Sequence, residues 1–179
     1  MIIRDKDILL TDRLELKYSK EFAEIANDST ISENIASHSF PSPYTESDAE
    51  YFFTKNRSEG KRKFSIDFLI FQDMKICGVI GLQDINYIDR NCHIGYWIGN
   101  KYRGKKIATR SVHIVSRYAE NKLSMHKLYT KVLETNIPSM KVLLNNDFKI
   151  EGYQKDQFFQ NGRYFGMFLF ARTGFGERQ

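Results

Sequence analysis

The residues best suited to chemistry lie in one stretch, Asn91 to Tyr118, which reads NCHIGYWIGNKYRGKKIATRSVHIVSRY. Four cations and one glycine stand together in its middle, from Lys101 to Ile107. We expect a strand before this loop and a helix after it, so the loop leads into a helix N-terminus. That position offers unpaired backbone N–H groups and the positive end of the helix dipole, and the glycine permits close approach of the backbone. The loop therefore predicts an anion-binding site.

The flanking elements follow from hydrophobic periodicity. In the expected strand, Cys92 and Ile94 belong to an apolar set that alternates with His93, Gly95 and Trp97, which is the period of a strand. Parity places His93 on the mixed face with Gly95 and Trp97, and a β-bulge would upset that inference. A helix is predicted from near Ala108, with one apolar stripe formed by Ala108, Val112, Val115 and Ala119.

Composition limits the class of protein. With 179 residues and 41% hydrophobic content, we expect one domain over residues 1–179 with a single core. No apolar run approaches the roughly 20 residues that span a bilayer, and the first residues are too charged for a secretion signal. Cys77 and Cys92 form no metal spacing. We therefore expect a cytoplasmic protein with reduced thiols, no metal site and no membrane partner.

The positive charge suggests an anionic ligand. The net charge is +5 and the sequence pI is about 9.1, which fits either the polyphosphate end of a coenzyme or RNA. The cations gather at Lys101–Arg110 and again at Lys61–Lys63, and no recognised RNA-binding signature accompanies them. We favour the coenzyme and expect no direct nucleic-acid binding.

The whole chain predicts a mixed α/β or α+β layer, in the order strand, two helices, three strands, helix, strand, helix and hairpin. The strands are expected over Ile8–Leu16, Phe64–Phe71, Ile76–Asp84, Asn91–Ile98 and Lys127–Glu134, with a final hairpin of Phe148–Phe159 and Arg163–Ala171 around Asn161-Gly162. Three further helices are expected. The first begins near Ser19, and the second begins at a Thr45/Asp48 capping box and ends before Gly60. The third begins at Asn136, with Leu143 and Leu144 facing inward. Between the first two helices, residues 27–44 are expected to be a functional loop or a broken helix.

Three motifs resemble those of the GCN5-related N-acetyltransferases (GNAT), in particular the Rim-type branch that includes ribosomal-protein N-acetyltransferases. Arg103 to Ala108 resembles the R-x-x-G-x-G/A pyrophosphate loop, preceded by an IGYW strand, and Leu9 to Leu16 resembles the L-x-T-x-R-L-x-L opening strand. Asn136 with Ser139, followed by Phe148, resembles the N-x-x-S and terminal G-F signature. Lys106 and Asp147 stand where those motifs have glycine.

This resemblance implies a GNAT fold, with a mixed, mostly antiparallel central sheet that is splayed in the middle and helices on both faces. It also implies an acyltransferase with acetyl-CoA as co-substrate and no metal. Backbone and side-chain groups of twelve residues would hold the coenzyme: Trp97, Ile98, Gly99, Arg103, Gly104, Lys105, Lys106, Ile107, Ala108, Thr109, Asn136 and Ser139.

The catalytic residues are less determined by the resemblance. His93 stands where Rim-type sequences commonly have a glutamate, and an imidazole with a pKa near 6.5 can accept a proton at neutral pH. His93 is thus either the general base or a polar histidine at the end of a strand. The tyrosine that serves many relatives as acid is replaced by Leu143. Ser139 then either protonates the leaving thiolate or only caps its helix.

The acceptor is expected to be a primary amine, bound by the segment that contains His38, Phe40 and Tyr44, which shapes the acceptor site in relatives. At pH 7 an α-amino group is neutral about one time in seven and a lysine about one time in 2,500, so a mild base suits an α-amine. The Rim-type resemblance implies N-termini of ribosomal proteins as substrates, so a protein N-terminus of this type is favoured. Two alternatives are an acetyltransferase of a small amine, such as a polyamine or antibiotic, and a catalytically silent module that binds ribosomes or RNA. A monomer and a homodimer both fit the sequence.

Overall fold

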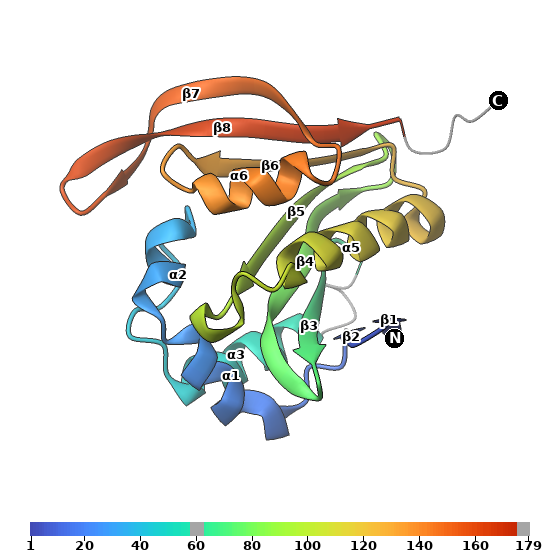
Figure 1. Cartoon of the computed structure of the whole chain (residues 1–179), viewed down its shortest axis with the longest axis vertical. Coiled ribbons are helices and arrows are strands. Elements are labelled where there is room, and N and C mark those ends of the chain that lie inside the picture. Colours follow the sequence, from blue (N-terminus) through green and yellow to red (C-terminus); the bar gives the residue numbers. More distant parts are fainter. Residues whose placement is uncertain (58–62, 175–179) are drawn as a thin grey trace.

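The computed structural model describes residues 1–57 and 63–174 (Figure 1). Its strands are β1 (Ile2–Asp5), β2 (Ile8–Thr11), β3 (Ile66–Gln72), β4 (Lys75–Asn86), β5 (Asn91–Ile98), β6 (Lys127–Leu133), β7 (Lys149–Gln160) and β8 (Arg163–Thr173). Its helices are α1 (Ser19–Ala26), α2 (Ser29–Asn34), α3 (Glu46–Arg57), α5 (Ile107–Leu123) and α6 (Ile137–Leu144). Short 3-10 turns lie at Leu16–Tyr18 and Asn100–Tyr102.

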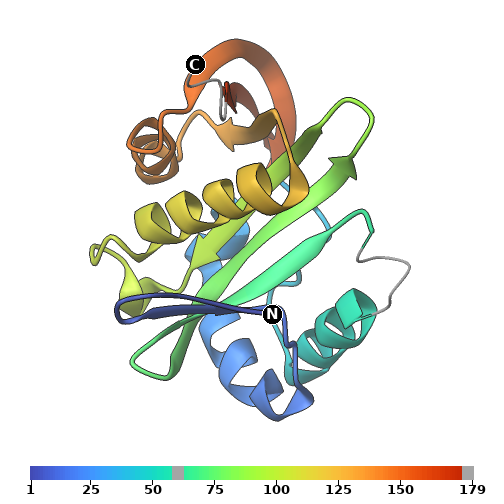
Figure 2. The same cartoon turned by 90° about the vertical axis from the view of Figure 1, so that its right-hand side faces the viewer.

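The strands form one sheet, with the order β1-β2-β3-β4-β5-β6-β8-β7. Neighbouring strands are antiparallel except β5 and β6, which run parallel. Helices α5 and α6 lie over one face of the sheet, and α1 and α3 lie over the other (Figure 2). The predicted architecture, a mostly antiparallel sheet with helices on both faces, is confirmed.

The first third of the chain differs from the prediction. The strand expected over Ile8–Leu16 ends at Thr11, and the chain then passes into the 3-10 turn that begins at Leu16. An additional short strand, β1, pairs with β2 at the edge of the sheet. The stretch expected to be a loop or a broken helix contains α2, whose N-cap Asp28 accepts a hydrogen bond from the Thr30 N–H.

Local capping explains where two helices begin. Ahead of α3, the Thr45 N–H donates to Asp48 and the Asp48 N–H donates to the Thr45 hydroxyl, which is the predicted capping box. The end predicted before Gly60 and the cations Lys61 and Arg62 lie outside the described residues. At α6 the Asn136 side chain accepts from the Ser139 N–H at 3.2 Å. Leu143 is buried as predicted, whereas Leu144 is 54% exposed, which corrects its inward assignment.

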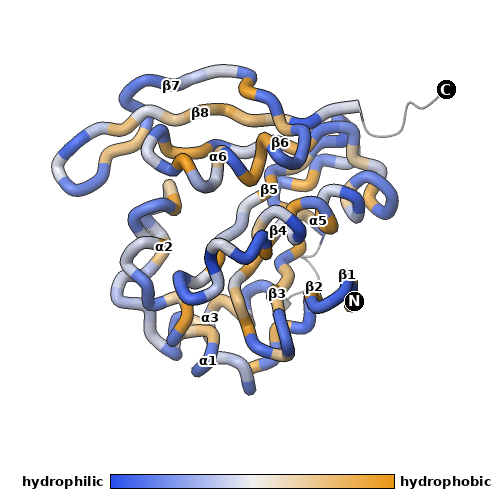
Figure 3. Tube along the Cα trace, in the orientation of Figure 1, coloured by the Kyte–Doolittle hydropathy of each residue, from blue (hydrophilic) through white to orange (hydrophobic). Residues whose placement is uncertain are grey.

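The core lies on both sides of the central strands. On one side, Val112, Val115 and Ala119 of α5 are fully buried, so the predicted helical stripe faces the sheet. Hydrophobic residues run along β3 and β4, whereas the edge strand β7 is largely hydrophilic (Figure 3).

Among the helices of the described residues, none is long and apolar enough to cross a membrane.

The sheet divides between β5 and β6. These strands pair only at Asn91 with Lys127, Cys92 with Leu128, and His93 with Tyr129. Beyond this point β5 continues to Ile98 and β6 continues to Leu133 without pairing with each other, and Figure 1 shows the two strands diverging. We call this divergence the fork and His93 and Tyr129 its apex. It is the splay that the family resemblance implies.

Gly78 of β4 lies directly against β5 near the open end of the fork. A Cβ atom on Gly78 would clash with the Trp97 carbonyl oxygen, which is backbone and cannot move without shifting β5. A Cβ atom on Gly152 of β7 would meet only the Leu169 Cδ1 atom, at 3.4 Å. The two strand glycines therefore differ in what a methyl group would displace.

We predict that Gly78→Ala lowers the free energy of unfolding by about 2 kcal/mol or more, because added volume forces the backbone of β5 away from β4. Gly152→Ala, the matched control, should change it by less than about 1 kcal/mol. Urea unfolding of both variants measures the difference. Equal losses would show that the close approach of β4 and β5 is not what requires Gly78.

Candidate functional site

A cleft of about 1310 Å³ runs across the face of the sheet at the fork. Its floor includes Gln83 of β4 and His93 of β5, and its far wall includes Thr130 of β6 and Ser139 of α6. The segment that precedes α3 forms another wall through Phe40. The cleft thus joins the predicted base, the predicted acid and the predicted acceptor segment in one space.

The backbone of β5 presents a free edge to the fork. The Gly99 N–H donates to the Cys77 carbonyl at 2.9 Å, so odd-numbered residues of β5 turn their backbone groups toward β4. Even-numbered residues, including Tyr96 and Ile98, turn theirs toward the fork. Of the predicted backbone contacts, Ile98 therefore faces the fork, whereas Trp97 and Gly99 face β4. No backbone contact was predicted for Tyr96, although the two-residue alternation along β5 could have identified it as facing the fork.

The predicted phosphate loop has the geometry of an anion site. Gly104 has a φ of +77° and Lys106 a φ of +59°, and Lys106 is the N-cap of α5. Within the part of the chain that is described, no side chain caps this helix, so its first N–H groups remain available. Residues Gly104 to Thr109 lie on this loop and first turn, as predicted, and Lys105 is exposed beside the Tyr102 ring.

Both departures from the glycine pattern occur in the left-handed region of φ. Lys106 has a φ of +59° and Asp147 a φ of +63°. These are the backbone conformations that glycine adopts at least cost, and other residues can adopt them at a cost of about 1–2 kcal/mol. At both positions the backbone therefore keeps a conformation typical of glycine although the residue is different.

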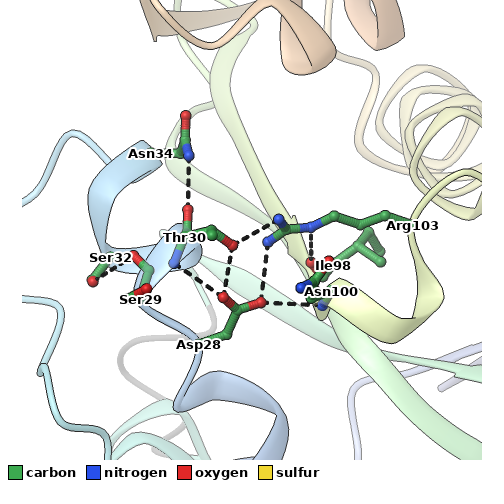
Figure 4. A network of polar contacts seen from close by, with 8 residues as sticks. All are labelled: Asp28, Ser29, Thr30, Ser32, Asn34, Ile98, Asn100 and Arg103. Atoms are coloured by element: carbon green, nitrogen blue, oxygen red, sulfur yellow. Dashed lines mark hydrogen bonds and ion pairs between the residues drawn. The ribbon is translucent and has the colours of Figure 1, made fainter.

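Arg103 is not directed at the phosphate loop. Its guanidinium group contacts the Ile98 carbonyl, the Thr30 hydroxyl and the Asp28 carboxylate at 3.0, 2.7 and 3.4 Å (Figure 4). Asp28 also accepts from the Asn100 N–H at 3.2 Å. Burial raises the pKa of Asp28, but hydrogen bonds from the Thr30 hydroxyl and N–H, together with the charge of Arg103, outweigh burial and leave the pKa lowered. Arg103 therefore ties α2 to the loop that precedes α5. Its predicted contact with the coenzyme would have to come from its backbone.

His93 lies at the apex of the fork, on the same face as Gly95, as strand parity predicted. Its Nδ1 atom is 3.0 Å from the Gln83 Oε1 atom, and its Nε2 atom is 3.3 Å from the Thr130 hydroxyl. Burial lowers the pKa of His93; Asp84 has a smaller opposing effect, and Lys131 lowers the pKa further. The imidazole is therefore held neutral and can accept a proton.

Ser139 has a partner that the sequence did not suggest. The Tyr96 hydroxyl is 2.9 Å from the Ser139 hydroxyl and donates to the Ser139 carbonyl at 3.2 Å. Burial raises the pKa of Tyr96. The pair joins β5 to α6 across the fork, and Asn136 is engaged at the N-cap of the same helix. The polar contact between Tyr96 and Ser139 depends on the fork, which spacing alone does not reveal.

The acceptor segment reaches the cleft at two of its three predicted residues. Phe40 and Tyr44 line the cleft, and their rings are 5.1 Å apart. The Phe40 ring is also 6.4 Å from the Trp97 ring. His38 instead stacks on Phe158 of β7, with 4.7 Å between the ring centroids. His38 therefore packs behind Phe158, which itself lines the cleft.

The described residues contain no cluster of three His, Cys, Asp or Glu side chains that could hold a metal. Cys77 and Cys92 are buried free thiols, and burial raises their pKa values to about 11 and about 12. Neither sulfur is therefore activated as a nucleophile. His93, Ser139 and Tyr96 are among the polar side chains that line the cleft.

Comparison with known proteins agrees with this arrangement. The chain is 27% identical over 112 residues to a ribosomal-protein-serine acetyltransferase of Escherichia coli, with 63% of each chain aligned. It is 30% identical over 97 residues to a spermidine N(1)-acetyltransferase of the same species, covering 54% of this chain and 52% of the relative. The chain thus spans about half to under two thirds of these relatives.

The fold has solved counterparts. A ribosomal L7/L12 α-N-protein acetyltransferase in complex with coenzyme A superposes with a TM-score of 0.87 and 20% identity, covering 97% of this chain and 98% of the other. The model of the acetyltransferase (GNAT) domain family matches residues 10–149, which is most of the chain. The fork, the loop before α5 and this match together establish that the chain belongs to the GNAT acetyltransferase family.

Proposed function

We propose that this protein is an acetyl-CoA-dependent N-acetyltransferase that acts on a primary amine. The observation that carries the proposal is the fork: an unpaired edge of β5 runs from the neutral His93 at the apex toward the uncapped N-terminus of α5. Ile98 lies five residue steps along the strand from His93, which is about 17 Å of extended chain. An extended ligand with an anionic end fits such a slot.

The coenzyme would be held by groups along this path. The first N–H groups of α5 and the loop around Gly104 would hold its phosphates. Backbone groups of Tyr96 and the N–H of Ile98, whose carbonyl already accepts from Arg103, would bind its extended arm. Acetyl-CoA, when bound, supplies the acetyl group as an activated thioester, and the chain's own residues position the amine and transfer its proton.

His93 would accept the proton of the attacking amine. Its imidazole is neutral at pH 7 because burial lowers its pKa, so it is ready to act as a base. As the amine nitrogen bonds to the thioester carbon and the C–S bond breaks, Ser139, whose hydroxyl is held by Tyr96, would donate a hydrogen bond or a proton to the leaving thiolate. Direct attack with both substrates bound requires only these groups and their positioning.

We propose a protein N-terminal α-amine as the acceptor. The ionisation of an α-amine suits a mild base, and relatives by sequence include a ribosomal-protein-serine acetyltransferase. A small polyamine is the second candidate, favoured by the relatives that acetylate spermidine and by Asp48, Asp67 and Asp84 in the lining of the cleft. Lys55 and Lys131 also line the cleft, which weakens the attraction for a polycation.

The coenzyme site can be tested by thermal unfolding with acetyl-CoA. At about 100 times the dissociation constant, binding should stabilise the protein by roughly 2.7 kcal/mol and raise the Tm by several degrees. Gly104→Glu should remove most of this shift, because it places a carboxylate in the phosphate loop.

Gly162→Glu is the matched control. Gly162 also has a positive φ, +80°, and its Cβ position is also open, but it lies in the β7–β8 turn. This variant should bear the same backbone cost and keep the full ligand shift. If both variants respond to acetyl-CoA like the wild type, the assignment of the loop is wrong.

We predict that His93→Gln lowers kcat by about 10² to 10⁴ while the thermal shift with acetyl-CoA is retained. In the wild type, kcat measured with saturating acceptor should fall on the acid side with a midpoint below 6.5. The sign follows because the base must be neutral and the lowered pKa keeps it neutral to lower pH. A variant with undiminished kcat would remove His93 from the mechanism.

A panel of acceptors tests the substrate class. A peptide with a free N-terminus should have a kcat/KM at pH 7 at least about ten times that of the same peptide with a blocked N-terminus and an internal lysine, because far more of its amine is neutral. Spermidine, assayed in parallel, should be the poorer acceptor. Faster turnover of spermidine would favour the second candidate. Binding of RNA with no transfer to any amine would favour a silent module.

A further inference from the structure

Both ring nitrogens of His93 have defined partners on the strands that flank β5. Nδ1 is 3.0 Å from Oε1 of Gln83, on β4, and Nε2 is 3.3 Å from the hydroxyl of Thr130, on β6. An amide oxygen can only accept, whereas a hydroxyl can donate. Gln83 therefore specifies that Nδ1 carries the hydrogen, and Nε2 keeps a lone pair.

The surroundings of the Gln83 amide fit this orientation. A Cβ atom built on Gly95 would be 3.7 Å from the Gln83 Oε1 atom and 3.4 Å from the His93 ring, so the oxygen lies on the His93 side. A Cβ atom built on Gly81 would clash with the Asp67 carboxylate and lie 3.3 Å from the Gln83 Nε2 atom. The amide nitrogen thus lies on the side of a carboxylate, which is the favourable arrangement for an N–H donor.

A β-bulge brings Gln83 to this position. Asn86 pairs with Asn91, and uninterrupted pairing from there would place Asp84 opposite His93. The register shifts between Gln83 and Asn86, and Asp84 adopts a φ of +51°. Gln83 consequently pairs with His93. The bulge replaces a carboxylate by a neutral amide as the partner of the imidazole.

Other groups also act on the imidazole. Asp84 favours its protonated form, Lys131 of β6 disfavours it, and the Tyr129 ring packs edge-on at 5.7 Å. Asp67 of β3 lies on the far side of Gln83. Burial has the largest effect and keeps the ring neutral. The contact of Nε2 with Thr130 is long for a hydrogen bond from a hydroxyl, so an amine can replace it at small cost.

We infer that Gln83 is a positioning residue that fixes His93 as the Nδ1–H tautomer, so that Nε2, at the apex of the fork beside Thr130, is the atom that accepts the proton. In the step, the proton leaves the amine nitrogen for Nε2, and the Nδ1–H bond to Gln83 is retained and strengthened in the resulting imidazolium. The inference rests on the proposed function for the role of the base. The tautomer itself can be observed without any activity.

The test is ¹⁵N NMR of histidine-labelled protein, which distinguishes the two tautomers and follows the titration of each ring. His93 is assigned by the loss of its signals in His93→Gln. The wild-type protein should show the Nδ1–H form at neutral pH. In Gln83→Glu the carboxylate keeps the geometry but stabilises the imidazolium. The titration midpoint of His93 and the acid limb of kcat, measured with saturating acceptor, should therefore both rise by about one to two pH units.

Two further variants complete the design. Gln83→Leu should lose the preference for the Nδ1–H form and lower kcat about tenfold or more while KM for acetyl-CoA stays the same, and Gln83→Glu should recover much of this kcat above its raised midpoint. Gln160→Glu adds the same charge at the distant end of β7, and should leave the titration of His93 in place.

An Nε2–H form in the wild type, or an unchanged midpoint in Gln83→Glu, would overturn the inference. An Nδ1–H form that responds to Gln83→Glu, in a protein that transfers acetyl to no amine, would uphold the role of Gln83 in fixing the tautomer. That outcome would instead reject the proposed enzyme function, so the two failures are distinguishable.

Discussion

The arrangement of this molecule depends on the early end of the pairing between β5 and β6. Only three residue pairs join these parallel strands, and past His93 both run on with their facing backbone groups turned into the fork. Backbone N–H and C=O groups inside a protein need partners, so an open edge in mid-sheet is kept only where water or a ligand completes it. The fork also brings together residues from β4, β5, β6 and α6 that would be separated in a closed sheet. The candidate chemistry is a consequence of this geometry.

Polar contacts hold the two arms of the fork in place. Tyr96 and Ser139 connect β5 to α6, while Arg103 connects the end of β5 to α2 through Asp28 and Thr30. Arg103 thus links two parts of the site. One is the loop before α5, which would hold phosphates, and the other is α2, which leads into the acceptor wall. The Arg103 side chain is thus a structural link, while the coenzyme contact expected of Arg103 concerns its backbone N–H. The anion-binding capacity of the loop rests on the backbone of the α5 N-terminus, with its left-handed Lys106.

Periodicity and turn chemistry were enough to predict most of the elements. The alternation in β5, the stripe on α5, the Asn161-Gly162 hairpin and the Thr45/Asp48 box all have short-range causes, and each is present in the structure. The long-range partners could not be predicted in this way. Arg103 meets residues more than 70 positions away, and the partner of His93 is decided by a bulge at Asp84 that moves the register by one residue. The fork itself came from family resemblance, because no local pattern in β5 or β6 marks where their pairing stops.

Amide-resolved hydrogen exchange, with and without saturating coenzyme A, tests most directly that the fork is the coenzyme slot. The account predicts that the Tyr96 and Ile98 amides exchange readily in the free protein and become strongly protected with coenzyme A. The Trp97 and Gly99 amides, which face β4, should be protected in both states. Unchanged exchange at Tyr96 and Ile98 under saturating coenzyme, or equal protection of all four amides in the free protein, would contradict it.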